Sequence, residues 1–152
     1  MKQGFVKVAS ATPRIRVADP VYNAQVICEQ AKEAAEHGAK IVVFPELCIT
    51  GYTCNDLFLQ ELLLEKAKEA LLTIAEETGQ LETLFLVGLP VDKDGRLYNV
   101  AAVLYRGRIL GMIPKKNIPM YAEFYEGRHF TPGEETVTEY LSLIHISEPT
   151  RR

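Results

Sequence analysis

The polypeptide is organised around the segment Ile41-Val42-Val43-Phe44-Pro45-Glu46-Leu47-Cys48-Ile49-Thr50-Gly51-Tyr52-Thr53-Cys54-Asn55-Asp56. Its apolar, β-branched start predicts a short buried strand over residues 40–43. Pro45 ends that strand because proline has no N–H to donate to a neighbouring strand. Glu46 is therefore expected where the strand leaves the sheet, which is where α/β proteins place their chemistry. A carboxylate at such a position can serve as a general base.

The residues before this segment predict a strand, a helix and then the strand at 40–43. Residues 5–10 have the apolar pattern of a strand. Asp19 and Pro20 supply a helix N-cap and a proline at the first helical position, and Gly38 supplies the C-terminal cap. The two strands are expected to be parallel, with the helix covering one face of the sheet.

The residues after Glu46 predict a second helix, capped by Asn55 or Asp56, that continues to about residue 78 and ends at Gly79. The helical spacing of its apolar residues predicts a buried side made of Leu59, Leu62, Leu63, Ala67, Ala70, Leu71, Ile74 and Ala75.

Three further strands are predicted over residues 83–91, 97–105 and 108–113. Short turn sequences separate them, which is typical of an antiparallel meander. The first of the three is so apolar that we expect it to be covered on both faces.

Composition excludes several function classes. With 152 residues, 47% of them apolar, the chain is expected to form one globular domain. Its formal net charge of −3 gives no general attraction for nucleic acid or anionic lipid, and no apolar run approaches the length of a membrane span. The N-terminus does not resemble a secretion signal, so we expect a cytoplasmic protein.

Cysteine and histidine usage gives little support to a disulfide or metal centre. Cys28, Cys48 and Cys54 form no Cys-x-x-Cys pair, and their odd number favours reduced thiols. Cys48 and Cys54 are interpreted as small buried hydrophobic residues, because neither has a histidine nearby in sequence to activate it. The three histidines are scattered. We expect neither a metal nor a cofactor in this segment.

The ends of two strands carry opposite charges. One strand ends in Phe-Pro-Glu and another in Ile-Pro-Lys, so Glu46 and Lys115 are expected at the same edge of one sheet. Their mutual attraction would keep both ionised, and an ammonium next to a carbonyl substrate can stabilise a developing oxyanion. Either residue alone is more often a solvated surface group; the two together favour a functional site.

Two longer motifs carry a resemblance to a known family. The first is Phe44-Pro45-Glu46-Leu47-Cys48-Ile49-Thr50-Gly51-Tyr52 followed by Asn55-Asp56-Leu57-Phe58, and the second is Pro114-Lys115-Lys116-Asn117-Ile118-Pro119-Met120-Tyr121-Ala122-Glu123-Phe124-Tyr125-Glu126-Gly127-Arg128-His129-Phe130. Over about residues 3–138 the sequence resembles the carbon–nitrogen hydrolase (nitrilase) superfamily. The second motif is similar to the N-terminal glutaminase domain of glutamine-dependent NAD synthetases.

The resemblance implies an α/β fold, an α-β-β-α sandwich that is incomplete at the C-terminus, formed by residues 1–140 as a partial domain. It also implies a Glu-Lys-Cys triad that cleaves glutamine to glutamate and ammonia. By motif, Glu46 resembles the general base and Lys115 the lysine that stabilises the tetrahedral intermediate. Tyr52 resembles a tyrosine lining the glutamine pocket, and Tyr121 and Glu126 resemble residues near the substrate and the interface with the synthetase domain.

The nucleophilic cysteine of that family lies several tens of residues beyond the lysine, and no residue of this sequence occupies that position. The segment alone is therefore expected to be inactive. The resemblance further implies a C-terminal synthetase domain, absent from this sequence, which uses ATP and magnesium to amidate deamido-NAD. It also implies that the parent protein is a homo-oligomer.

The match ends near Leu141. Residues 141–152 resemble translated sequencing-adapter read-through, and we interpret them as a non-native tail. The alternating pattern of residues 141–146 leaves a genuine strand as the alternative.

Two other functions remain open. A stand-alone amidase or nitrilase of the same superfamily would share Glu46 and Lys115 and lack the ATP-dependent partner domain. A non-catalytic module would keep the pocket and bind a small amide or a partner chain.

Overall fold

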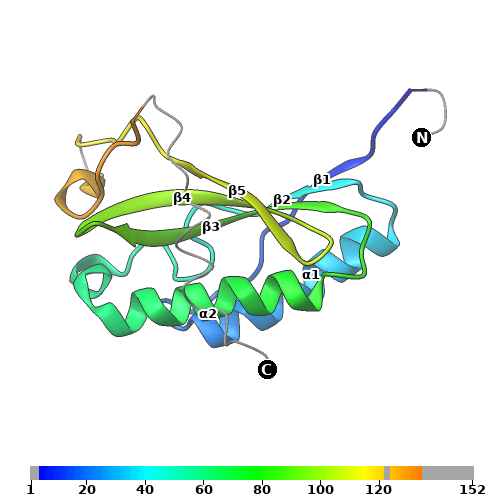
Figure 1. The fold of residues 1–152 in the computed structure, drawn as a ribbon, viewed down its shortest axis with the longest axis horizontal. Helices are drawn as coiled ribbons and strands as arrows, with labels where there is room; N and C mark the ends of the chain where they lie inside the picture. The colour runs from blue at the N-terminus through cyan, green and yellow to red at the C-terminus, as the bar shows by residue number, and fades with distance from the viewer. Residues whose placement is uncertain (1–3, 122–123, 135–152) are drawn as a thin grey trace.

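The computed structural model describes residues 4–121 and 124–134. Its elements (Figure 1), with η denoting a 3-10 helix, are β1 (Val8–Ser10), α1 (Pro20–Glu36), β2 (Ile41–Val43), η1 (Asn55–Leu59), α2 (Glu61–Glu77), β3 (Leu84–Lys93), β4 (Arg96–Tyr105), β5 (Arg108–Pro114) and η2 (Glu126–Arg128). The interpretation of residues 141–152 as a tail, and the alternative strand over 141–146, lie outside the described residues.

The strands form one sheet in the order β1-β2-β3-β4-β5. β1 and β2 are parallel, as are β2 and β3, whereas β3, β4 and β5 run antiparallel to one another. The predicted parallel unit and the predicted meander are both confirmed. Helices α1 and α2 lie on the same side of the sheet (Figure 1). Of the expected sandwich, the described residues form one layer of helices and one sheet.

The first helix begins and ends where the sequence predicts. The Asp19 side chain accepts a hydrogen bond from the backbone N–H of Tyr22 at 3.1 Å, and Pro20 is the first helical residue. After the helix, Gly38 has a φ of +84°, a conformation that glycine adopts without strain. Within residues 4–121 and 124–134, no helix combines the length and the apolar character needed to cross a bilayer.

The predicted start of the second helix is wrong. Residues Asn55–Leu59 form η1 instead, and the extended backbone of Gln60 separates it from α2. As a result Leu59 and Leu62, both predicted to be buried, are exposed. The other residues predicted for that face are buried from Leu63 onward.

The core lies between the helices and one face of the sheet. Strand residues facing the helices alternate along each strand, as the period of two requires. Those that are fully or almost fully buried are Val42, Phe85, Val87, Leu89, Val100, Ala102 and Leu104. They pack against Ile27, Ala31, Leu71 and Ile74 of the two helices.

The opposite face of β3 is not covered as predicted. Leu86 lies on that face and is partly exposed, and Val43 and Ile113 from neighbouring strands are exposed. Only one layer of helices is present among the described residues. The apolar character of β3 was therefore not sufficient to predict burial on both faces. At Gly88, however, the loop carrying Glu46 lies against this face. The site therefore sits at one end of an apolar sheet surface.

Candidate active site

The loop carrying Glu46 is held against β3 on both sides of the glutamate. The backbone N–H of Phe44 donates to the carbonyl of Leu86 at 2.9 Å, and that of Ile49 donates to the carbonyl of Gly88 at 3.1 Å. Between these bonds the chain turns at Leu47, whose φ is +52°. Glu46 is thus fixed by backbone geometry where β2 ends, as the proline predicted.

Gly88 makes this approach possible. A Cβ at this position would lie 2.8 Å from the Pro45 carbonyl oxygen and would also clash with the backbone nitrogen of Leu47. We expect Gly88→Ala to lower the free energy of unfolding by about 1–3 kcal/mol, because the backbone of the loop must move to admit the methyl group. Chemical denaturation measures this loss.

Gly111 in β5 supplies the matched control. A Cβ there meets no atom within 4 Å, so Gly111→Ala should leave stability nearly unchanged. Equal effects of the two substitutions would contradict the close approach at Gly88.

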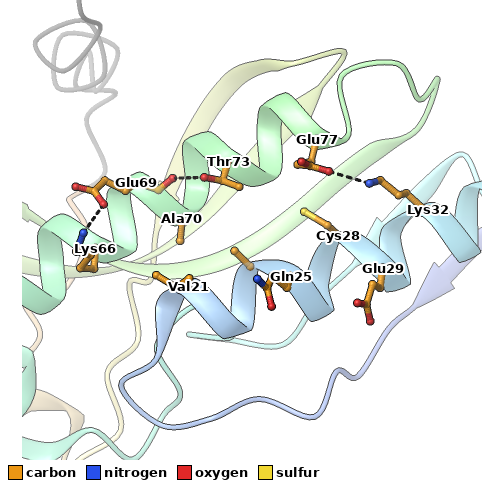
Figure 2. A pocket seen from close by; sticks show the side chains of 11 residues that line it. Val21, Gln25, Cys28, Glu29, Lys32, Lys66, Glu69, Ala70, Thr73 and Glu77 are labelled. Carbon is orange, nitrogen blue, oxygen red and sulfur yellow. Dashed lines mark hydrogen bonds and ion pairs between the residues drawn. The ribbon is translucent and has the colours of Figure 1, made fainter.

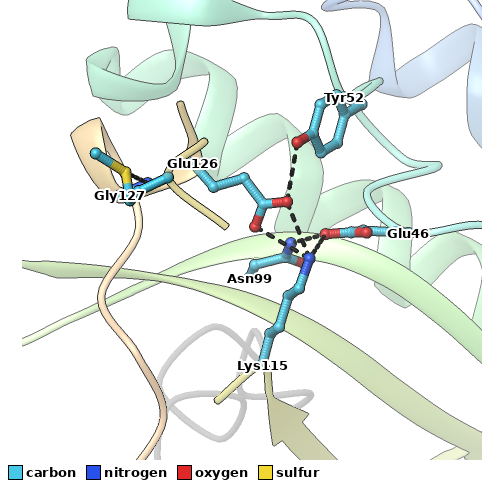
Figure 3. A network of polar contacts seen from close by, with 7 residues as sticks. Glu46, Tyr52, Asn99, Lys115, Glu126 and Gly127 are labelled. Atoms are coloured by element: carbon cyan, nitrogen blue, oxygen red, sulfur yellow. Dashed lines mark hydrogen bonds and ion pairs between the residues drawn. The ribbon is translucent and has the colours of Figure 1, made fainter. Parts of the chain in front are cut away.

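Lys115 lies directly after the end of β5, and its side chain extends to Glu46. Its backbone N–H donates to the carbonyl of Asn99 at 2.8 Å, directly after β5. Its ammonium Nζ donates to Oε1 of Glu46 at 2.7 Å (Figure 3). The predicted meeting of the two strand ends is therefore confirmed.

Glu126 is the second carboxylate at the lysine. Its Oε1 and Oε2 accept from Lys115 Nζ at 2.9 and 3.2 Å, and its Oε1 also accepts from the Tyr52 hydroxyl at 2.9 Å. The Glu126 side chain is 4% exposed, whereas that of Glu46 is 40% exposed. The Lys115 ammonium thus lies between the buried carboxylate of Glu126, both of whose oxygens accept hydrogen bonds, and the accessible carboxylate of Glu46 (Figure 3).

The protonation states follow from these contacts. Desolvation lowers the pKa of Lys115, but the hydrogen bonds to Glu46 and Glu126 outweigh it and hold that pKa above its ordinary 10.5. Burial, together with the hydrogen bond to Glu126, raises the pKa of Tyr52 to about 12. At neutral pH, Lys115 is therefore a cation and Tyr52 a neutral hydrogen-bond donor.

A cavity of about 350 Å³ opens beside the charged residues on the exposed sheet face. Glu46, Asn99 and Lys115 line one end of it. Its walls are otherwise apolar and include Val43, Leu86, Ala101 and Ile113. An apolar hollow with a few convergent polar groups is typical of a small-molecule site.

Asn99 belongs to this site and was not predicted. It is 4% exposed, and its amide Nδ2 donates to Glu46 Oε1. The available signal was a single amide within the otherwise apolar middle of β4.

Tyr121 lies apart from the charged centre. Its side chain is 70% exposed, and its ring contacts that of Phe124 with 5.6 Å between centroids. Among the hydrogen bonds of residues 4–121 and 124–134, none joins its side chain to Glu46, Lys115 or Glu126. A substrate-binding role for Tyr121 stays a prediction.

The cysteines are buried, as the sequence suggested. Burial raises the pKa of Cys28 and of Cys48 to about 11, and it also raises the pKa of Cys54. All three therefore remain neutral thiols near pH 7, unlike a nucleophilic thiolate.

Asp56 ties the loop after Glu46 to the segment that carries Glu126. Its two oxygens contact His129 Nε2 at 3.0 Å and an Arg128 guanidinium nitrogen at 3.2 Å. Beneath these contacts, the rings of Phe58 and Phe130 pack edge to face, with centroids 5.0 Å apart. This cluster holds Glu126 in reach of Lys115.

The Asp56 contacts predict a pH dependence of stability. The hydrogen bond with His129, and then the charge of Arg128, hold the pKa of Asp56 below its ordinary 3.8. A carboxylate whose pKa is lower in the folded than in the unfolded state stabilises the fold at pH values above its unfolded-state pKa. This stabilisation is lost as the pH falls through the folded-state pKa. Asp56→Asn should therefore lower the Tm at neutral pH, by an amount that narrows as the pH falls below 3.8. Thermal unfolding across pH measures it.

Glu69→Gln is the control for this experiment, because it removes an exposed ion pair with Lys66 inside α2. Such pairs contribute little to stability. A Tm difference for Asp56→Asn that stays constant down to acid pH would count against the Asp56 contacts.

A second cavity, of about 400 Å³, lies between α1 and α2 (Figure 2). Four of its charged groups are paired, since Lys32 contacts Glu77 and Lys66 contacts Glu69, each at 2.8 Å. None of the predicted site residues lines it. The candidate chemistry therefore belongs to the cavity on the sheet face.

Across residues 4–121 and 124–134, no three His, Cys, Asp or Glu side chains are grouped so as to hold a metal ion.

Several known proteins are similar to this chain in sequence and in fold. The chain is 40% identical over 133 residues to the glutamine-dependent NAD(+) synthetase of Mycobacterium tuberculosis, covering 88% of this chain and 20% of that protein. A crystal structure of a glutamine-dependent NAD(+) synthetase from Cytophaga hutchinsonii superposes with a TM-score of 0.82 at 30% identity, covering 87% of this chain and 22% of the other.

An amidase is also similar. A variant of the amidase from Nesterenkonia sp. AN1 matches with a TM-score of 0.71 at 25% identity, over 86% of this chain and 49% of that one. In that variant the acetamide moiety of fluoroacetamide is covalently added at the active site cysteine.

The nitrilase-like α/β fold expected from the sequence is thus confirmed by its structural neighbours. The chain spans about a fifth of the length of the mycobacterial synthetases and about a quarter of that from Thermotoga maritima. A family model described as carbon-nitrogen hydrolase matches residues 7–144. The chain belongs to the carbon–nitrogen hydrolase family.

Proposed function

We propose that this chain is the N-terminal glutaminase segment of a cytoplasmic, glutamine-dependent NAD synthetase. The observation that carries the proposal is the ammonium of Lys115, shared between accessible Glu46 and buried Glu126 at the end of an apolar cavity. The similarity to glutamine-dependent NAD synthetases supports the choice of glutamine as substrate.

In the proposed reaction, a cysteine thiol transfers its proton to Glu46 and the sulfur attacks the amide carbon of glutamine. The carbonyl oxygen becomes an oxyanion, which the Lys115 ammonium stabilises. Glu46 then returns the proton to the leaving nitrogen, and ammonia departs as the thioester forms. Water, deprotonated by Glu46, attacks the thioester, and collapse of this second intermediate releases glutamate and restores the thiol.

The nucleophile in this proposal is a cysteine outside the 152 residues. Cys28, Cys48 and Cys54 are poor candidates because they are buried neutral thiols. Residues 1–152 alone should therefore not turn over glutamine. In this scheme Glu126 holds Lys115 in place and Tyr52 donates to Glu126. The roles of Tyr52 and Glu126 in binding the substrate stay predictions.

The ammonia is proposed to reach a synthetase domain that uses ATP and magnesium to amidate deamido-NAD. The test uses the longer protein that contains this chain and measures release of ammonia and glutamate from glutamine. We expect glutamine to be hydrolysed in preference to short aliphatic amides and nitriles, and its nitrogen to enter NAD when deamido-NAD, ATP and magnesium are present.

A stand-alone amidase is the second candidate, favoured by the similarity to the Nesterenkonia amidase. Hydrolysis of short amides or nitriles, without use of glutamine, would support it and contradict the glutaminase. Binding of amides without any hydrolysis would favour the non-catalytic module.

A further inference from the structure

Asn99 contacts both charged residues of the site. It lies in β4 opposite Pro90 of β3 and is almost completely buried. Its side-chain amide donates to Glu46 Oε1 (Figure 3), and its backbone carbonyl accepts from the Lys115 N–H at 2.8 Å. Asn99, in an interior strand of the sheet, thus binds the side chain of Glu46 and the backbone of Lys115.

The two oxygens of Glu46 are in different surroundings. Oε1 accepts from both Asn99 Nδ2 and Lys115 Nζ. Oε2 has no hydrogen-bond partner among the described residues. A carboxylate held by one oxygen presents the other for proton transfer, so the bonds to Oε1 select which atom can act as the base.

The contributions of the two donors to Oε1 differ. Lys115 also bonds both oxygens of Glu126, and its ammonium is the group that would turn toward a substrate oxyanion. The Asn99 amide carries no charge, does not titrate and projects from a strand paired on both sides. Without it, the accessible Glu46 side chain would rely on Lys115 alone.

We propose that Asn99 is a positioning residue that holds Glu46 by Oε1, so that Oε2 acts as the base while Lys115 engages the substrate. The inference rests on the proposed glutaminase function. The charged or titratable groups nearest to Glu46 in this network are Lys115 after β5, Glu126 of η2 and Tyr52 of the loop after β2.

Steady-state glutamine hydrolysis by the longer protein tests this role. Asn99→Ala should lower kcat about ten- to hundredfold with KM nearly unchanged, because the base is present but poorly placed. Asn99→Asp keeps the size of the side chain but places a second carboxylate against Glu46 in place of the amide donor, so it should lower kcat further.

Thr83→Val is the matched control. Thr83 is buried beside the far end of β3 and donates to the Ala39 carbonyl at 2.8 Å. Loss of this hydrogen bond should lower stability without changing kcat or KM. If Asn99→Ala and Asn99→Asp lower stability as Thr83→Val does and leave kcat unchanged, the inference is overturned.

A second measurement does not depend on turnover. The side-chain carboxyl resonance of Glu46, labelled with carbon-13 and assigned by its absence in Glu46→Gln, reports whether the group is held. It should shift and broaden in both Asn99 variants and stay unchanged in Thr83→Val. An unchanged resonance in the Asn99 variants overturns the inference, whereas a wild-type protein without glutaminase activity contradicts only the proposed function.

Discussion

Replacing Glu46 with glutamine is expected to lower kcat for glutamine hydrolysis by about 10²- to 10⁴-fold, the usual contribution of a general base. The glutamine amide oxygen can still accept hydrogen bonds from Lys115 and Asn99, but it cannot take a proton from a thiol or from water. The fold should tolerate the change, because the Glu46 side chain is 40% exposed. Ammonia release under steady-state conditions, with kcat and KM determined separately, measures the effect.

Glu69→Gln, at an exposed side chain of α2, is the control for the same chemical substitution, and it should leave the rate unchanged. A Glu46→Gln variant with near-normal glutaminase rates would remove Glu46 from the mechanism.

Replacing Lys115 with methionine is expected to lower kcat by about 10²- to 10³-fold, as loss of an oxyanion-stabilising donor does elsewhere. It should also destabilise the fold, because buried Glu126 loses its cationic partner. We expect a loss of about 1–3 kcal/mol, less than for a fully buried pair, since the Lys115 side chain is 31% exposed. Enzyme kinetics and chemical denaturation measure the two effects.

The two effects can be separated with a double variant. Lys115→Met combined with Glu126→Gln removes the unpaired charge and should recover much of the stability while the activity stays low. Lys116→Met, at the neighbouring lysine, should change neither. Recovery of activity in the double variant would show that Lys115 acts only by compensating the charge of Glu126.

Local signals account for much of what the sequence predicted. Asp19, Pro20 and Gly38 bound α1 through contacts within a few residues of each helix end, so they can be interpreted without knowing the fold. Pro45 and Pro114 likewise mark the ends of two strands. Together they predicted that Glu46 and Lys115 meet, and the 2.7 Å contact confirms it.

Long-range contacts account for what the sequence did not predict. Asp56 was one of two residues predicted to cap a helix, but its side chain contacts Arg128 and His129, 72 and 73 residues later in the chain. Asn99 meets Glu46 across 53 residues, and the register of β4 with β3 brings it there. Neither partner is visible in a local pattern.

The most direct test of the proposed chemistry is to map where a glutamine analogue with an electrophilic group in place of its amide reacts with the longer protein. Peptide mass spectrometry should find one adduct, blocked by excess glutamine, on a cysteine outside residues 1–152, and labelling should be much slower in Glu46→Gln. An adduct on Cys28, Cys48 or Cys54, or labelling at the same rate in Glu46→Gln, would contradict the account.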